Sequence, residues 1–207
     1  MKIVNISSGF MSANTYLIID EETNISAIVD PGGDSAHIIA QISANGTRTE
    51  KILLTHGHYD HILALDDVRK AVGAKVYIHR YDNICLKNTT YSLMEHIGRR
   101  DTFDDADVLL SDGDEITIGS EKVKAVHTPG HTAGSVCYIT DAGIITGDTL
   151  FFESIGRSDF PGGDAEALEE SVRGLYALDG DYVLYPGHGQ TTTLEHERKF
   201  NPYVRMQ

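Results

Sequence analysis

The chain has 207 residues, and its 31 acidic side chains outnumber the 17 basic ones, which gives a formal net charge of −14. So negative a field repels phosphate backbones and argues against a nucleic-acid partner. The sequence contains no run of about 18 apolar residues that would span a bilayer, and its N-terminus lacks the features of a secretory signal peptide. We therefore expect a cytoplasmic protein without a membrane partner that forms one domain over residues 1–207.

Short apolar runs rich in β-branched residues follow one another along the chain, and most of them end at Gly, Pro, Asp or His, which is typical of strands. The segment Ser35–Ala44 has apolar residues at helical spacing and predicts a helix. Further helices are expected from Asp60 to about Val72 and from about Ala165 to Leu178, and residues 80–107 form a less regular segment that could act as a lid. Strands that alternate with helices indicate an α/β fold in which helices enclose two sheets. The predicted strands are Ile3–Ile6, Tyr16–Ile19, Ser26–Val29, Lys51–Leu54, Lys75–Ile78, Glu115–Ile118, Lys122–Val126, Val136–Thr140, Ile144–Thr146 and Tyr182–Tyr185.

A cluster of metal-binding residue types directly follows the predicted strand Lys51–Leu54. It consists of His56, His58, Asp60 and His61. Imidazole binds borderline metals such as zinc, iron and manganese, and the alternating spacing of the first two histidines lets their rings converge on one ion. The aspartate could simply cap a helix, but that interpretation leaves three neighbouring histidines unexplained. The cluster therefore predicts a metal site.

Three later strands end in the same way. His131, Asp148 and His188 each come shortly after a predicted strand, and glycine lies beside each of them. Ligands of α/β proteins gather outside the carboxyl ends of strands. Each of these residues alone would be an ordinary turn residue, but together they indicate one site at the edge of the sheets.

The number of candidate ligands indicates two ions. A catalytic site with one zinc ion uses three protein ligands and water, and a structural zinc site is usually rich in cysteine, whereas Cys85 and Cys137 lie outside these motifs. We expect two divalent ions, with zinc as the first choice and iron or manganese as alternatives. Asp148 is the natural bridge between them. The expected division is His56, His58 and His131 on one ion, and Asp60, His61 and His188 on the other.

The order of these motifs resembles the metallo-β-lactamase superfamily over nearly the whole chain. The resemblance implies an αβ/βα four-layer sandwich with the metal site at one edge of two mixed sheets. The segments Ser154–Asp164 and Tyr185–Thr192 further resemble short type II glyoxalases, the hydroxyacylglutathione hydrolases that cleave S-D-lactoylglutathione. Longer members of that group have a C-terminal helical domain that contributes to the glutathione site. We expect that domain to be absent here, which leaves the natural thiol open.

The resemblance implies a metal-dependent hydrolase that cleaves a small acylthiol, S-D-lactoylglutathione or a related thioester, by means of a hydroxide that bridges the metals. No further catalytic residue is assigned. A thiolate with a pKa of about 8.5 can leave without a strong general acid, whereas an amide nitrogen must be protonated. The alternatives are an iron-dependent persulfide dioxygenase and a lactonase of the same fold; a β-lactamase is disfavoured. The oligomeric state is left open.

Two further residues are candidates for supporting roles. Asp30 follows a predicted strand and would orient a metal ligand or contact the substrate, although a plain turn explains it equally well. Arg157 would either form an ion pair with Asp159 that stiffens its loop or anchor the substrate. Thr55 and Thr132 lie beside candidate ligands in the sequence and are candidates for hydrogen bonds that support those ligands.

Overall fold

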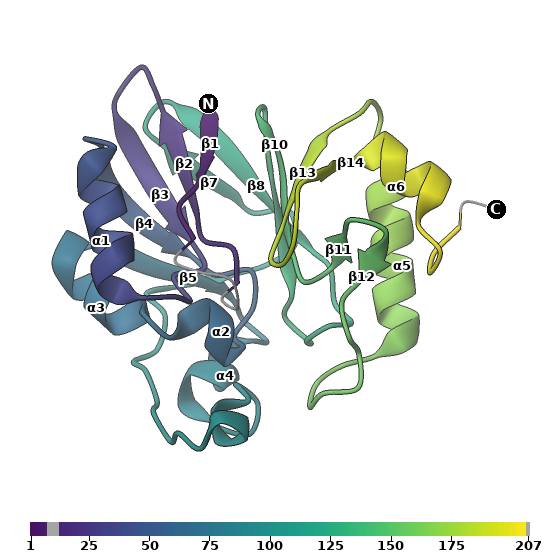
Figure 1. Cartoon of the computed structure of the whole chain (residues 1–207), viewed down its shortest axis with the longest axis horizontal. Coiled ribbons are helices and arrows are strands. Elements are labelled where there is room, and N and C mark those ends of the chain that lie inside the picture. Colours follow the sequence, from purple (N-terminus) through teal and green to yellow (C-terminus); the bar gives the residue numbers. More distant parts are fainter. Residues whose placement is uncertain (8–12, 206–207) are drawn as a thin grey trace.

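Two six-stranded β-sheets face each other in the computed structural model, which describes residues 1–7 and 13–205, and helices cover the outer face of each sheet (Figure 1). In the first sheet the three N-terminal strands run antiparallel and the remaining neighbours run parallel. In spatial order this sheet contains β1 (Lys2–Asn5), β2 (Tyr16–Asp20), β3 (Ile25–Val29), β4 (Arg48–Leu53), β5 (Lys75–His79) and β6 (Val108–Leu110).

The second sheet is built from the C-terminal half of the chain. Its strands are antiparallel except for β10 and β13, which run parallel to each other. A small hairpin of β11 (Leu150–Phe151) and β12 (Ser154–Ile155) follows the central strand β10. In spatial order the sheet contains β14 (Thr192–Thr193), β13 (Val183–Pro186), β10 (Gly143–Gly147), β9 (Val136–Thr140), β8 (Glu121–His127) and β7 (Glu115–Ile118).

The longer helices form the two outer layers. α1 (Ser35–Ala44) and α3 (Leu65–Val72) cover the first sheet, and α5 (Ala165–Tyr176) and α6 (Leu194–Phe200) cover the second (Figure 1). Asp34 and Asp164 cap α1 and α5, because their side chains accept hydrogen bonds from the first free backbone N–H groups. The short helices α2 (Tyr59–Ile62), α4 (Asn83–Lys87) and η1 (Met94–Ile97) lie in the connections at one end of the sandwich.

Alternation along the strands separates three apolar layers. Leu17 and its neighbours pack with Ile38 of α1, while Tyr16 and Ile18 of the same strand face the space between the sheets. A third buried cluster joins the second sheet to α5, where Leu184 packs with Val172. These layers confirm the expected four-layer sandwich with two mixed sheets.

The helix predicted from Asp60 to Val72 is wrong as one element, because it is broken between α2 and α3. The backbone N–H of Ala64 donates to Pro31 O instead of to the carbonyl four residues earlier. That carbonyl, of Asp60, packs closely against Gly32. The helices at Ser35–Ala44 and Ala165–Tyr176 confirm the other two predictions. The sequence patterns gave no prediction for β6, β11, β12, β14 or α6.

Gly32→Ala is expected to destabilise the fold and to displace α2. A Cβ at Gly32 would lie 1.5 Å from the carbonyl oxygen of Asp60, so the backbone must move. We expect the free energy of unfolding, measured by urea titration, to fall by about 3 kcal/mol. Gly174→Ala is the matched control, because a Cβ there meets nothing within 4 Å; it should be neutral or stabilise α5 by up to about 1 kcal/mol. Equal effects of the two substitutions would contradict the close packing.

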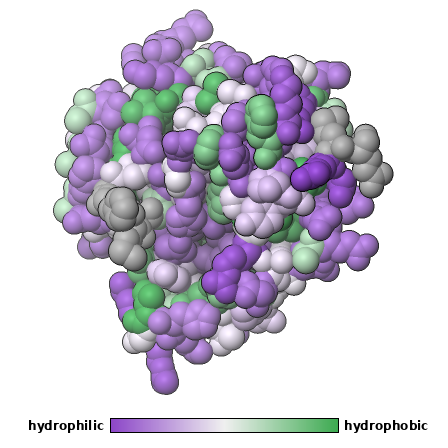
Figure 2. Space-filling view, turned by 45° about the vertical axis from the view of Figure 1, so that its right-hand side comes forward, coloured by the Kyte–Doolittle hydropathy of each residue, from purple (hydrophilic) through white to green (hydrophobic). Residues whose placement is uncertain are grey.

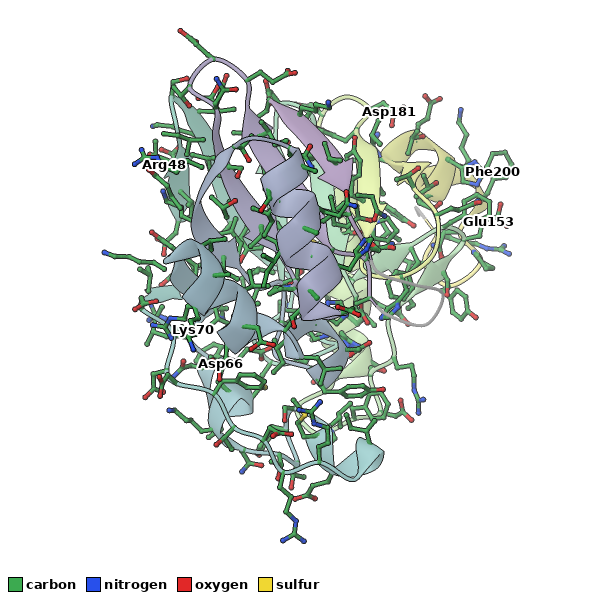
Figure 3. The ribbon with its side chains drawn as sticks, turned by 60° about the vertical axis from the view of Figure 1, so that its left-hand side comes forward. Arg48, Asp66, Lys70, Glu153, Asp181 and Phe200 are labelled. Carbon is green, nitrogen blue, oxygen red and sulfur yellow. The ribbon has the colours of Figure 1, made fainter. Side chains whose placement is uncertain are left out.

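The surface is hydrophilic and charged. On the face shown in Figure 2, hydrophilic residues cover most of the area and the hydrophobic areas are small and separated. Charged side chains such as Arg48, Lys70 and Asp181 point outward in Figure 3, and Phe200 is an exposed aromatic exception at 60%. None of the helices in the described ranges is long and apolar enough to cross a membrane.

Candidate metal centre

The four predicted strand ends meet at one edge of the sandwich. β4 belongs to the first sheet, and β8, β10 and β13 belong to the second. Backbone hydrogen bonds join the loops that follow them: Val136 N donates to Thr55 O at 2.8 Å, and Gly187 N donates to Gly147 O at 2.8 Å. The seven candidate ligands therefore come together from both sheets, as the strand-end pattern predicts. They form the groups His56–His58–His131, Asp60–His61–His188 and His56–His61–Asp148.

Asp148 lies between the two triads. Its Oδ2 is 3.4 Å from His131 Nε2 and 3.5 Å from His188 Nε2, and its Oδ1 is 3.4 Å from His61 Nε2. The carboxylate thus faces one residue of the first triad and two of the second. This is the position that a carboxylate shared by two ions would occupy.

The second triad is held together by Asp60. Its Oδ2 lies 3.1 Å from His188 Nε2 and 3.9 Å from His61 Nε2. Asp60 is in the first turn of α2, directly after the β4 loop, and His188 is in the loop after β13. In the first triad, His58 Nδ1 lies 2.9 Å from His131 Nε2. Two of the three groups contain the same residues as the two triads expected from the sequence, and the third joins His56 and His61 with Asp148.

Four buried atoms in this cluster have no hydrogen-bond partner among the described residues. They are His56 Nε2, His58 Nε2, His61 Nε2 and Asp148 Oδ1. His56, His61 and Asp148 also form one of the groups whose ligand atoms lie within 4.8 Å of one another. Buried polar atoms are almost always paired, because an unpaired one costs about 1–3 kcal/mol. Unpaired nitrogen and oxygen atoms that converge on one buried point are suited to binding a cation. The residues present therefore fit the metal ions that the sequence motifs imply.

Hydrogen bonds behind the cluster set which histidine nitrogens face it. Asp30 Oδ2 is 2.9 Å from His61 Nδ1, so that nitrogen carries a hydrogen and Nε2 is the ring nitrogen that faces the cluster. Asp30 also accepts from Thr55 N at 2.8 Å and Thr55 Oγ1 at 2.6 Å. Because the threonine hydroxyl donates to Asp30, its oxygen can accept from His56 Nδ1, which is 3.1 Å away. Asp30, which has a φ of 52°, thus lies behind the cluster and orients two of its histidines.

The backbone of Arg157 supports a candidate ligand, whereas its side chain binds Asp159. Its carbonyl oxygen accepts from His131 Nδ1 at 2.7 Å, which leaves His131 Nε2 free to face the cluster. Its guanidinium forms two hydrogen bonds to Asp159, at 2.9 and 2.7 Å, and lies 4.2 Å from the centre of the Phe160 ring. The structure therefore contains the loop ion pair that was one of the two sequence interpretations.

The titration of the cluster suits cation binding. Burial lowers the pKa of His56 far below its usual value and that of His58 to about 3, so both imidazoles are neutral near pH 7. Burial also acts on His61, but neighbouring carboxylates, Asp148 first, outweigh it and raise the pKa of this histidine. Burial lowers the pKa of His188 too, but the hydrogen bond to Asp60 and the charges of Asp148 and Asp60 together outweigh it and raise the pKa. The carboxylates of Asp60 and Asp148 thus favour positive charge in this buried site even without a metal ion.

One buried carboxylate near the cluster has no counterpart in the sequence prediction. Asp82 is 1% exposed, and its Oδ2 accepts from Gly57 N at 3.0 Å and from Thr132 Oγ1 at 2.8 Å. Its Oδ1 accepts from Gly134 N at 2.7 Å. Gly57 separates two histidines of the β4 loop, and the other two partners follow His131 in the loop after β8. Asp82 therefore ties together the two loops that form the first triad.

Asp82→Asn is expected to loosen these loops. An amide in place of the carboxylate presents an N–H₂ group to at least one of the three donors, which then loses its acceptor in a buried place. We expect the free energy of unfolding of the metal-free protein to fall by about 2 kcal/mol in urea titrations. The matched control is Asp105→Asn, since Asp105 is exposed and accepts from Asn83. Equal stability of Asp82→Asn and the control would show that Asp82 does not hold the loops.

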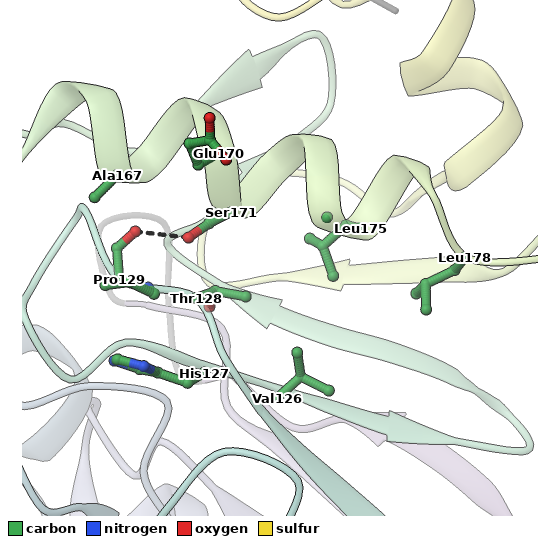
Figure 4. Close-up of a pocket in the computed structure, with 10 residues that line it drawn as sticks. Val126, His127, Thr128, Pro129, Ala167, Glu170, Ser171, Leu175 and Leu178 are labelled. Atoms are coloured by element: carbon green, nitrogen blue, oxygen red, sulfur yellow. Dashed lines mark hydrogen bonds between the residues drawn. The ribbon is translucent and has the colours of Figure 1, made fainter.

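Other supporting contacts also come from distant parts of the chain. The side-chain amide of Asn14 donates to Pro186 O and to Gly189 O, both at 2.9 Å, and so fixes the loop that carries His188. On the other side, Ser171 of α5 donates to Pro129 O at 2.7 Å in the loop before His131 (Figure 4). This hydrogen bond lies beside a cavity of about 400 Å³ between β8 and α5, which none of the seven candidate ligands lines.

Comparison with known proteins agrees with this geometry. Residues 8–188 match the family described as the metallo-beta-lactamase superfamily. The chain is 36% identical over 208 residues to the "probable metallo-hydrolase YqgX" of Bacillus subtilis, with 99% of this chain and 98% of that protein covered. It is 32% identical over 200 residues to the hydroxyacylglutathione hydrolase GloC of Haemophilus influenzae, with 92% of each covered.

Two solved structures are similar over almost their whole length. The crystal structure of BLEG-1 B3 metallo-beta-lactamase superposes with a TM-score of 0.92 at 34% identity and covers 98% of this chain and 99% of that one. TTHA1623 in a di-iron-bound form has a TM-score of 0.87 at 30% identity, with 97% and 100% covered. Fold, motif order and family match agree, and the chain belongs to the metallo-beta-lactamase superfamily.

Proposed function

We propose that this protein is a binuclear metal-dependent hydrolase that cleaves a thioester, S-D-lactoylglutathione or a related acylthiol. The observation that carries the proposal is the pair of triads at one edge of the sandwich, one of three histidines and one of Asp60, His61 and His188, with the Asp148 carboxylate facing both. The ligands would be His56, His58 and His131 on one ion, Asp60, His61 and His188 on the other, and Asp148 on both. Zinc is the first choice, and iron, which a similar structure holds as a di-iron pair, or manganese is the alternative.

The relatives support hydrolysis and this substrate class to different degrees. The relative from Bacillus subtilis is named as a metallo-hydrolase, and the relative from Haemophilus influenzae is named as a hydroxyacylglutathione hydrolase. In the proposed reaction, water adds its oxygen to the acyl carbon, the C–S bond breaks, and the products are a carboxylic acid and a thiol. Bound divalent ions supply a water of pKa about 7 and polarise a carbonyl group.

The chain itself contributes charge and orientation. His56 and His58 stay neutral at pH 7 and offer lone pairs without a competing proton. Asp60 and Asp148 would offset part of the charge of two divalent ions. Asp30 and the carbonyl of Arg157 keep the histidine rings in one tautomer. A thiolate leaving group needs no general acid, because its conjugate thiol has a pKa of about 8.5.

A second candidate function is hydrolysis of a β-lactam, because a structure at 34% identity is that of a B3 metallo-beta-lactamase. That reaction breaks an amide bond, whose nitrogen has to acquire a proton as it leaves. The persulfide dioxygenase considered from the sequence would use one iron with two histidines and one aspartate. Such a site leaves the triad of Asp60, His61 and His188 without a role.

The deciding experiment combines metal analysis with turnover of four probes. The purified protein is analysed for metals and then assayed with S-D-lactoylglutathione, glutathione persulfide, a homoserine lactone and a cephalosporin. We expect about two ions per chain and hydrolysis of the thioester at the highest kcat/KM. One iron per chain with oxygen consumption on the persulfide would overturn the proposal. Faster opening of the lactone or the lactam would replace the thioester by that substrate class.

Metal uptake is expected to release protons. Because the pKa values of His61 and His188 are raised, the metal-free site binds protons on these rings more strongly than an ordinary histidine does, and an ion has to displace them. Affinity for Zn²⁺ should therefore increase as the pH rises from about 6 to 8, because fewer protons compete. Calorimetric titrations in buffers of different ionisation enthalpy would measure the proton release. An affinity that does not change with pH would contradict this assignment.

A further inference from the structure

A cavity of about 320 Å³ opens directly above the candidate metal centre. Its floor is polar and is formed by candidate ligands, while most of its walls are apolar or aromatic. A cavity of this size is near the lower end of the range for small-molecule sites. The floor residues are His58, Asp60, His131, Asp148 and His188, and the wall residues are Tyr59, Leu93, His96, Phe151, Ile155, Arg157 and Phe160.

Two phenylalanine rings stand beside the two triads. The Phe160 ring centre is 5.8 Å from that of His58, and the Phe151 ring centre is 6.1 Å from that of His188. A carbonyl group placed over the ligands would therefore have an aromatic wall on each side. Hydrocarbon groups next to that carbonyl lose their water against these rings, which is favourable by about 25 cal/mol for each Å².

Leu93, which lines the cavity, has a strained backbone conformation. Its φ is 60° and its ψ is 15°, a left-handed conformation that is unfavourable for a branched side chain, yet the residue is only 4% exposed. Backbone hydrogen bonds hold this conformation: His96 N donates to Leu93 O, and Tyr59 N donates to Ser92 O. Glycine or asparagine would be the ordinary choice for such a turn. A leucine there places an apolar side chain against the cavity, and strain of this kind is concentrated at functional sites.

The walls offer little to a negatively charged substrate. Among the described residues that line the cavity, Arg157 is the one lysine or arginine, and its guanidinium is already bound by Asp159 through two hydrogen bonds. The chain as a whole carries a charge of −14. A thiol with free carboxylates, such as glutathione, therefore finds no unpaired guanidinium or ammonium group in these walls.

We propose that the cavity selects thioesters with a short, branched or aromatic hydrocarbon acyl group, and that it does not discriminate in favour of a glutathione leaving group. This inference rests on the proposed thioester hydrolysis and specifies its substrate class. The acyl group would contact Phe160, Phe151 and Leu93, and the carbonyl would lie over the ligands.

The test uses two acyl groups of nearly the same shape on one thiol. S-isobutyryl-N-acetylcysteamine and S-lactoyl-N-acetylcysteamine differ by a methyl group in place of a hydroxyl group. After division by the rate of hydroxide-catalysed hydrolysis, we expect kcat/KM to be about tenfold higher for the isobutyryl ester, because the hydroxyl loses its water and the side chains of Phe160, Phe151 and Leu93 offer it no hydrogen bond. Exchanging the thiol for glutathione should change kcat/KM by less than about fivefold, the limit for an exposed ion pair.

Two cavity variants and one control connect this preference to the walls. Phe160→Ala and Leu93→Gly should each reduce the isobutyryl preference to less than about threefold; the glycine also relieves the backbone strain, which offsets part of the stability lost with the leucine side chain. Phe200→Ala is the matched control on an exposed ring outside the cavity and should keep the preference. A lactoyl preference, or a preference that survives both cavity variants, overturns the inference.

A binding measurement keeps this test separate from that of the proposed function. If the metal-loaded protein hydrolyses no thioester, the proposed function itself is overturned. In that case calorimetry with the S-isobutyl and S-(2-hydroxypropyl) thioethers of N-acetylcysteamine still tests the walls. We expect about tenfold tighter binding of the isobutyl thioether to the wild type and a loss of this difference in Leu93→Gly. Equal binding of the two thioethers to the wild type overturns the inference.

Discussion

Asp148→Ala is expected to reduce the metal content from two ions per chain to about one and to lower kcat by roughly 10³-fold. Asp148 is the residue whose two oxygens face both triads, at 3.4 Å from His61 and His131 and 3.5 Å from His188. Removing it takes away one unit of negative charge from between two cations in a buried place. The cations then repel each other with less compensation, and the more weakly held ion is lost.

The measurement is metal analysis of the dialysed protein together with thioester turnover at saturating substrate. Asp164→Ala is the matched control, because Asp164 caps α5 and its side chain accepts from Glu166 N and Ala167 N. That variant should lose about 1 kcal/mol of stability and keep its metals and activity. Asp148→Ala with both ions and wild-type turnover would show that the carboxylate is not shared.

The ligand motifs could be predicted from the sequence because their signal is local. Metal binding demands particular residue types, and those types stand close together in the β4 loop or directly after a strand. The alternation of apolar residues likewise located most of the central strands, such as Val136–Thr140, within one or two residues. Both signals depend on neighbours a few positions apart, which one sequence displays.

The supporting contacts could not be predicted, because their partners are backbone groups far along the chain. Asp82 accepts from Gly134 N, 52 residues away, and Asn14 donates to Pro186 O, 172 residues away. Any residue has a backbone N–H or C=O, so these contacts leave no residue-type pattern. The break before α3 has the same origin, since Ala64 N is drawn to Pro31 O on another segment. Short edge strands such as β14 are set by their partner strand instead of by their own two residues.

Replacing the Asp30 carboxylate by an amide should change metal binding, although Asp30 is not one of the seven candidate ligands. Asp30 accepts from His61 Nδ1, from Thr55 N and from Thr55 Oγ1. In Asp30→Asn the new amide nitrogen faces the histidine and the threonine hydroxyl, which are both donors, so at least one of them has to turn away. Asparagine tolerates the positive φ of 52° at this position, so the backbone keeps its conformation.

Asp30→Asn is therefore expected to weaken binding of Zn²⁺ by 10- to 100-fold at the site that His61 serves, about the loss that follows when the group behind a metal-binding histidine is replaced. Competition with a chromophoric chelator measures the affinity of the wild type and the variant. Asp20→Asn is the matched control: Asp20 is a buried carboxylate that accepts from Thr23 Oγ1 and Ser120 N, so its loss should lower thermal stability and leave zinc affinity unchanged. If both variants lose the same affinity, the effect belongs to general destabilisation of the fold. A loss confined to Asp30→Asn shows that the orientation of His61 is set by the carboxylate behind it.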